Sequence, residues 1–378
     1  MFYCMTERLS ILFLLLHFVA APLFSQQPQR PQTPVEPFPY ESVEVVFENR
    51  AEGASLAGTL TYPVGYEGMK WRKVPVVVMV TGSGIQNRDE EVFGHKPFAV
   101  IADWLANHGI ASLRYDDRGC GGSKGPLVGL TTENFASDAQ AAVEYLRGLK
   151  KFGKVGVLGH SEGGTVALML AGKGIPDFII SLAGVATQGV ECIVWQNEAL
   201  LQQQGAPKEW ADNYGKALRG VYAERIARFN GSLLSDIDSV RLRGGAVPDA
   251  QHFVQQMCRR DSISLPLNLM LNLALVASNE NLWLDWFVAY DPAETIGKIK
   301  CPVMAVNGSL DMQVPAQANL EVLQKLLPGN KKNLIKEYPY KNHLFQNCTE
   351  KNSLQYAKIE ETISSDVLEE ISAWIKRL

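Results

Sequence analysis

A serine stands between glycines in the stretch Gly159-His160-Ser161-Glu162-Gly163, which follows the apolar run of residues 154–158. A G-x-S-x-G pattern after a buried strand is typical of a sharp turn into a helix, and bulky side chains two positions either side would collide across that turn. The turn presents the serine hydroxyl as a nucleophile. Residues 164–171 suit the helix that must follow, so strand, turn and helix occur in the required order.

A serine hydroxyl becomes reactive beside an imidazole that takes its proton and a carboxylate that orients the imidazole. Asp311 follows the apolar run of residues 302–306, and His343 follows that of residues 333–338. Singly, Asp311 could be a helix N-terminal residue and His343 a surface histidine. Together, the chain order Ser161, Asp311, His343 and the three strand ends predict a catalytic triad.

Acyl transfer also needs N–H donors for a developing oxyanion. We predict one donor at the N–H of Glu162, where the helix begins after Ser161. The second is expected at the N–H of Ser83, in the Gly-containing loop after residues 74–80, with Gly84 as the next choice. A phosphate-binding loop is the rival interpretation, but the G-x-x-x-x-G-K spacing is absent.

Three other features have simpler interpretations. The segment 116–123 predicts a tight hydrogen-bonded turn whose charges pair locally. The imidazole of His160 is expected to point away from the nucleophile across the turn. A group of aromatic side chains could line an acyl pocket or pack in the core, and the sequence leaves both open: Trp283, Trp286, Phe287 and Tyr290.

The segments that must position these residues alternate between short apolar strands and helices. An antiparallel opening pair (42–47 and 54–62) precedes predicted strands at 74–80, 110–115, 154–158, 178–183, 302–306 and 333–338, with helices at 96–108, 132–149, 316–327 and 366–376. This rhythm predicts an α/β fold with a mostly parallel central sheet flanked by helices.

The rhythm is interrupted where apolar residues adopt helical spacing. We therefore predict core segments at 40–186 and 296–378 and a helical insertion at 187–295. Ligands of open α/β sheets bind at the carboxyl ends of the strands, so the insertion is expected to cap the site. The alternative is a structural addition far from the chemistry. No substrate-binding residue is indicated.

The composition of the 378-residue chain, 46% hydrophobic and 20% charged, is that of a globular protein with a large core. A formal net charge of −4 and the lack of a basic run disfavour nucleic-acid binding. Neither cysteines nor histidines have metal-ligand spacing, so we expect no metal and no cofactor. Disulfide pairing and oligomeric state stay open.

Residues 1–25 contain Arg8 followed by an apolar block at 9–24, the pattern of a removable secretory signal peptide. An uncleaved membrane anchor is the alternative. The signal predicts export to the periplasm or the extracellular space, with membrane contact only through this segment. The Gln- and Pro-rich residues 26–39 are expected to form a flexible lead-in.

The elbow at 159–163, the turn at 116–123, the loop at 307–315 and Asn342-His343 together resemble the α/β-hydrolase superfamily. The likeness is greatest to exported bacterial esterases grouped with serine aminopeptidase-like and dienelactone hydrolase-like enzymes, and it covers about residues 40–378. It implies an α/β-hydrolase fold, to which the insertion at 187–295 adds the expected helical cap. One departure is Thr81-Gly82, where many relatives carry His-Gly.

The leading hypothesis is a serine hydrolase that cleaves small carboxylic esters through an acyl-enzyme on Ser161. His343 would act as base and then acid, and Asp311 would orient it. One alternative is a peptidase or thioesterase on the same fold, an aminopeptidase needing cap carboxylates such as Glu198, Glu209 and Glu224. Another is a catalytically silent ligand-binding protein.

Overall fold

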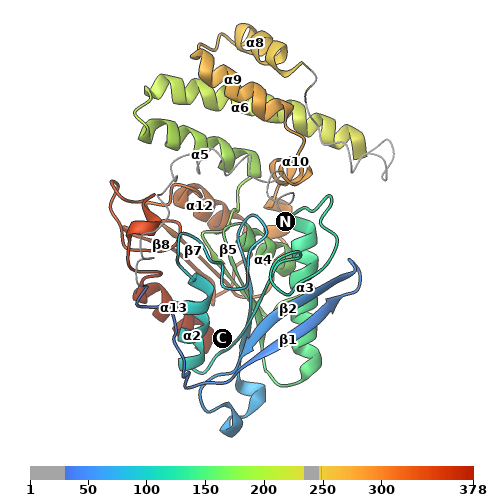
Figure 1. Cartoon of the computed structure of the whole chain (residues 1–378), viewed down its shortest axis with the longest axis vertical. Coiled ribbons are helices and arrows are strands. Elements are labelled where there is room, and N and C mark those ends of the chain that lie inside the picture. The colour runs from blue at the N-terminus through green and yellow to red at the C-terminus, as the bar shows by residue number, and fades with distance from the viewer. Residues whose placement is uncertain (1–29, 234–246, 248) are drawn as a thin grey trace. The chain divides into compact units, whose positions relative to one another are not determined.

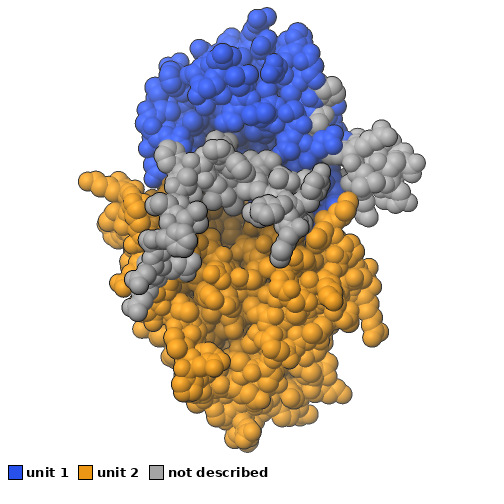
Figure 2. All heavy atoms as spheres, viewed as in Figure 1, with its two compact units in different colours: residues 1–26, 129–131, 188–290 blue, residues 27–128, 132–187, 291–378 orange. Residues whose placement is uncertain are grey.

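The structure, a computed structural model, describes residues 30–233, 247 and 249–378 (Figure 1). The predicted signal peptide at 1–25 lies outside the described residues. The described chain divides into two compact units, coloured separately in Figure 2. The helical unit contains residues 188–290 and 129–131, and the core unit contains most of the remainder. Within the described ranges, no helix is long and apolar enough to cross a membrane.

An eight-stranded sheet forms the centre of the core unit, in the order β1-β2-β4-β3-β5-β6-β7-β8. β1 pairs antiparallel with β2, and β2 with β4, whereas every other neighbouring pair is parallel. This confirms the predicted mostly parallel sheet. The strands are β1 (Ser42–Asn49), β2 (Ala54–Thr61), β3 (Val76–Val80), β4 (Ala111–Tyr115), β5 (Val155–His160), β6 (Phe178–Leu182), β7 (Val303–Gly308) and β8 (Leu334–Tyr338).

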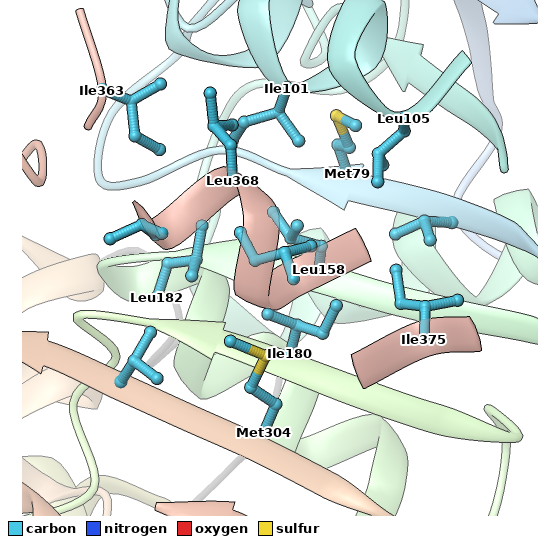
Figure 3. Packing of buried hydrophobic residues seen from close by; sticks show 14 of the residues in the cluster. Met79, Ile101, Leu105, Leu158, Ile180, Leu182, Met304, Ile363, Leu368 and Ile375 are labelled. Carbon is cyan, nitrogen blue, oxygen red and sulfur yellow. The ribbon is translucent and has the colours of Figure 1, made fainter. Parts of the chain in front are cut away.

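Helices cover both faces of this sheet, which explains why β3 is an unbroken run of buried residues. Val77 and Met79 belong to a buried cluster with residues of α2 and α13 (Figure 3). Because side chains alternate along a strand, Val76 and Val78 face the opposite side, where α3 and α4 contact β3. The core-unit helices are α2 (Pro97–Asn107), α3 (Thr132–Leu149), α4 (Glu162–Gly172), α11 (Ala293–Ile296), α12 (Ala316–Leu326) and α13 (Ser365–Lys376).

Three short 3₁₀ helices complete the core unit: η1 (Tyr66–Gly68), η2 (Trp71–Lys73) and η3 (Tyr356–Lys358). The described part of the predicted lead-in is anchored near η3. The Arg30 guanidinium donates to the carbonyls of Ala357 and Ile359 at 2.8 and 2.6 Å, and the Gln32 side chain bonds both backbone groups of Ile363. These side chain to backbone bonds link Arg30 and Gln32 to the core unit, and the flexibility of residues 26–39 stays a prediction.

The helical unit contains α5 (Gly189–Gln203), α6 (Lys208–Leu233), α8 (Ala250–Arg260), α9 (Leu267–Ser278) and α10 (Leu282–Ala289). Arg225 of α6 and Asp285 of α10 form a fully buried ion pair, with 2.8 Å between Nε and Oδ1. The same guanidinium donates to the carbonyls of Val276 and Asn279. One charged group thus joins three helical segments. The role of this unit as a cap stays a prediction.

Candidate active site

Ser161 lies in the turn between β5 and α4 with φ 54° and ψ −120°. This left-handed conformation costs a non-glycine residue about 1–3 kcal/mol, so surrounding packing must impose it. A side chain at Gly159 would strike the backbone of Gly163, and one at Gly163 would strike the carbonyls of Val80 and Thr81. Both positions therefore require glycine because a larger side chain would collide across the turn, as the pattern predicts. Ser161 itself is only partly buried.

Asp311 and His343 form a buried pair on the loops that follow β7 and β8. His343 Nδ1 lies 2.8 Å from Asp311 Oδ2, and Asp311 Oδ1 accepts the backbone N–H groups of Gln313 and Val314 at 2.8 and 3.0 Å. A carboxylate that accepts these bonds makes Nδ1 the donor, which leaves Nε2 as the proton acceptor. The structure therefore brings together the predicted acid and base.

The end of β7 brings these two loops into contact. A side chain at Gly308 would strike the carbonyls of Lys341 and Asn342, and the N–H of Leu310 donates to the carbonyl of Lys341 at 2.9 Å. β5, β7 and β8 are parallel strands of one sheet, so their carboxyl ends lie on the same edge. Ser161, Asp311 and His343 all follow those ends, as predicted.

The turn at Ser161 meets the loop after β8 through His160. Its ring centroid lies 4.7 Å from that of His343, and its Nε2 lies 2.9 Å from the His343 carbonyl oxygen. Among the hydrogen bonds of the described residues, none joins Ser161 Oγ to His343. That link of the triad stays a prediction, and catalytic bonds of this kind often form only when substrate is bound.

The loop after β3 lies beside Ser161, since a side chain on Gly82 would come within 3.2 Å of Ser161 Cβ. The Gly82 N–H donates to Glu90 Oε1 at 2.8 Å and is thus occupied. In the described chain, the N–H of the exposed Ser83 has no intramolecular acceptor. Glu162 begins α4 directly after Ser161, and its buried side chain accepts from Thr132. Both oxyanion donors stay predictions.

The buried carboxyl of Asp117 binds the loop after β3 through two hydrogen bonds. Asp117 Oδ2 accepts Thr81 Oγ1 at 3.0 Å and the backbone N–H of Gln86 at 2.9 Å. Burial raises the pKa of Asp117 to about 7, more than these two bonds lower it. The Thr81 hydroxyl is therefore used to bind this carboxyl.

The turn at 116–123 holds its charges differently from the prediction of local pairing. Asp116 accepts from both the backbone and the guanidinium of Arg88, with 2.8 Å between Nη2 and Oδ2. Arg118 pairs with Asp138 of α3 at 2.6 Å. The tight hydrogen-bonded turn itself is observed, since the Ser123 N–H donates to the Cys120 carbonyl at 2.9 Å and the Ser123 hydroxyl to the Asp116 carbonyl at 2.7 Å. Only the expected local pairing of charges was wrong, because the fold brings ionic partners from the loop after β3 and from α3.

Glu90 and His160 are the functional candidates that sequence reasoning missed. Both are buried, and His160 Nδ1 lies 2.9 Å from Glu90 Oε1. Glu90 has φ 52°, a conformation that no sequence pattern reveals for a glutamate. The sequence feature that could have indicated this pair is a histidine inside the elbow, together with carboxylates in the loop after β3.

The candidate residues of the helical unit have partners of their own. Glu198 lies 3.6 Å from Arg219, and burial raises its pKa, while Glu224 bonds Arg228 at 2.9 Å. Trp283 stacks on Phe287, and Trp286 on Tyr290. Across the described ranges, no group of three or more metal-ligating side chains is present, and all five described cysteines are free thiols.

The sequence profile of the alpha/beta hydrolase fold family matches residues 75–339, which is well over half of the chain. The chain therefore belongs to the α/β hydrolase fold family. The matched range begins just before β3 and ends after β8, so it includes the elbow and Asp311 but stops before His343.

Among characterised relatives, esterase EstD from Thermotoga maritima is 33% identical over 128 residues. The match spans 34% of this chain and 30% of that esterase. Est1E from Butyrivibrio proteoclasticus, solved with ferulic acid, is 17% identical with a TM-score of 0.47 over 88% of this chain and 96% of its own. The Pyrococcus furiosus esterase Pf2001 is 15% identical with a TM-score of 0.48, over 95% and 97%. Nothing about this chain's substrate follows from these likenesses.

Proposed function

We propose that the protein is a carboxylic ester hydrolase that works through an acyl-enzyme on Ser161. The single observation that supports it most is the buried Asp311–His343 pair, which follows the same sheet edge as the strained Ser161. A buried carboxylate that fixes the tautomer of an imidazole is the arrangement that activates a serine. Membership of the hydrolase fold family and the partial likeness to a characterised esterase agree with this proposal.

In the proposed reaction, His343 Nε2 takes the proton of Ser161 Oγ as that oxygen attacks the ester carbonyl carbon. The carbonyl oxygen becomes an oxyanion, which the N–H groups of Ser83 and Glu162 would bind. The C–O bond to the alcohol then breaks, and His343 returns the proton to the leaving alcohol. Water repeats the sequence on the acyl-enzyme and releases the carboxylic acid. Asp311 stabilises the imidazolium in both halves.

The helical unit is proposed to select the substrate, because it lies in the chain between β6 and β7 and follows the carboxyl end of β6, the edge at which open α/β sheets bind ligands. Peptide cleavage is the less supported alternative, since Glu198 and Glu224, which could bind a substrate amine, already pair with arginines. Comparing esters of increasing acyl length with aminoacyl-anilides and thioesters would separate these activities. Residues 1–25 are proposed to direct export.

The test of the mechanism is Ser161→Ala in the full chain. We expect turnover of p-nitrophenyl acetate to fall by a factor on the order of 10⁶, because losing a triad nucleophile removes the covalent route. A fluorophosphonate should label the wild type and not the variant. Ser365→Ala, at an exposed serine in the first turn of α13, is the matched control and should retain both properties. Equal labelling and turnover by Ser161→Ala would exclude the proposal.

A further inference from the structure

A second acid–imidazole pair lies directly beside Asp311 and His343. Glu90, 2% exposed, and His160, 7% exposed, lie 2.9 Å apart between Oε1 and Nδ1. Glu90 Oε1 also accepts the Gly82 N–H at 2.8 Å, and His160 Nε2 lies 2.9 Å from the His343 carbonyl oxygen. The pair therefore bonds the loop after β3, the elbow and the loop after β8.

These three bonds can all form only if the pair holds a shared proton. The His343 carbonyl can only accept, so His160 Nε2 must carry hydrogen. The atom Glu90 Oε1 must accept from Gly82, and an ionised carboxylate must also accept from His160 Nδ1. Both ring nitrogens then carry hydrogen, which makes His160 an imidazolium. A neutral His160 beside a protonated Glu90 would also satisfy the three bonds, and the charges around the ring decide between the two forms.

The charges that face His160 favour the imidazolium. Glu90 contacts it from the β3 loop, Asp311 acts on it from the loop after β7, and the His343 carbonyl bonds it from the loop after β8. Burial lowers the pKa of His160, yet these groups together raise it above its ordinary value. In the described chain, Glu90 Oε2 has no partner, so the carboxylate depends on the two bonds of Oε1.

The placement of Glu90 is imposed by the fold. Its backbone adopts φ 52°, and its N–H donates to the carbonyl of Asn87 at 2.9 Å. A left-handed glutamate is costly unless its contacts compensate for it. Glu91, the next residue, is exposed and lies 3.7 Å from Lys96. Two neighbouring glutamates therefore have opposite environments, and only Glu90 bonds the residues around Ser161.

We propose that Glu90 and His160 are positioning residues. By means of their shared proton they hold the loop after β3, the elbow and the loop after β8 in one geometry. This rests on the proposed ester hydrolysis. Neither residue is proposed to touch substrate. Glu90 acts on Gly82, next to the predicted donor Ser83, while His160 acts on its neighbour Ser161 and on the backbone of His343.

The substitution Glu90→Gln tests this directly, because no neutral glutamine can satisfy all three bonds. An amide oxygen facing His160 and Gly82 would require an imidazolium without its counter-charge, and an amide nitrogen there would leave the Gly82 N–H without an acceptor. We expect kcat to fall about 10- to 100-fold because the site is misplaced. KM should change less than about threefold, since the substrate itself loses no contact.

Three comparisons give this result its meaning. Glu91→Gln should keep wild-type kcat. His160→Gln should lose as much as Glu90→Gln, and the double variant should lose little more than either, because coupled residues are not additive. Additive losses, or an unchanged kcat in Glu90→Gln with the Tm preserved, would overturn the proposal. A loss confined to Tm, with kcat normal below the transition, would also overturn it.

A readout that does not need activity is the ¹⁵N spectrum of the histidine rings in Ser161→Ala. Over a pH titration we expect the His160 ring to stay doubly protonated to a higher pH than a free imidazole. Its signals should disappear in Ser161→Ala/His160→Gln, and its second proton should be lost at a lower pH in Ser161→Ala/Glu90→Gln. A His160 ring that loses this proton at or below the pH of a free imidazole overturns the proposal. If Ser161→Ala stays active, the proposed ester mechanism is wrong. The spectrum still shows whether His160 carries the second proton, so failure of the mechanism and failure of the positioning proposal are distinguishable.

Discussion

At the residue scale, Asp117 is a buried acid whose pKa lies close to neutral pH. Burial raises its pKa from 3.8 to about 7 in the folded protein. The unfolded chain has the ordinary value, so the native state binds the proton more tightly and stability falls as the pH rises from about 4 to about 7. The total loss in the free energy of unfolding is at most about 4 kcal/mol, and it does not grow further above about pH 7.

Asp117→Asn should remove this dependence. The amide does not ionise, and its oxygen can still accept from Thr81 and from the Gln86 N–H. We expect the variant to gain Tm relative to the wild type progressively from pH 5 to pH 8, measured by circular dichroism. The exposed Glu350→Gln should keep the wild-type profile. A constant Tm difference across this range would show that Asp117 is ionised throughout.

Some residues of this site can be predicted from the sequence, and others cannot. Ser161, Asp311 and His343 can be located because each is the reactive type of residue directly after an apolar strand, and parallel strands end on one edge. Glu90 cannot, since its role depends on a positive φ and on the side chain of His160, 70 residues away in the sequence. The partners of Asp116 and Arg118 are non-local for the same reason.

At the element scale, local patterns predict the sheet well. The helix predicted at 132–149 is observed as Thr132–Leu149, and the elbow strand extends two residues further than the apolar run, to His160. His160 continues the strand because it pairs with Leu182 of β6. A prediction based on apolar runs misses this residue because histidine is polar. The strand order is not readable from local patterns, since β3 lies between β4 and β5.

The junction of β5 and α4 should be intolerant of added volume. In Gly163→Ala the new methyl group would strike the carbonyls of Val80 and Thr81, so β3 and the loop after it must shift. We expect a loss of about 1–3 kcal/mol in the free energy of unfolding and a lower kcat.

Gly148→Ala in α3 is the matched control, because a methyl group there meets nothing within 4 Å. Alanine is the better helix former, so this variant should gain up to about 1 kcal/mol with kcat unchanged. Denaturant unfolding and ester turnover measure both variants. Similar behaviour of the two would mean that the elbow can relax around added volume.

At the scale of the whole molecule, each compact unit has a buried interior of its own. The core unit is built around the sheet, with α2 and α13 against one face. The helical unit buries the Arg225–Asp285 pair together with apolar residues of α6, α9 and α10. Units with separate interiors can lose stability separately, because local unfolding follows the contacts that each region makes.

Asp285→Ala should therefore destabilise the helical unit selectively. It leaves the Arg225 guanidinium buried without its carboxylate, which costs about 3–5 kcal/mol. Hydrogen exchange followed by mass spectrometry should show faster exchange in 188–290 and little change in β5 or β7, and fluorophosphonate labelling of Ser161 should persist. Glu224→Ala, which breaks the exposed pair with Arg228, should cost about 0.5 kcal/mol or less. Equal acceleration in both units would mean that they unfold as one, because the loss of one buried pair would then be shared by the entire chain.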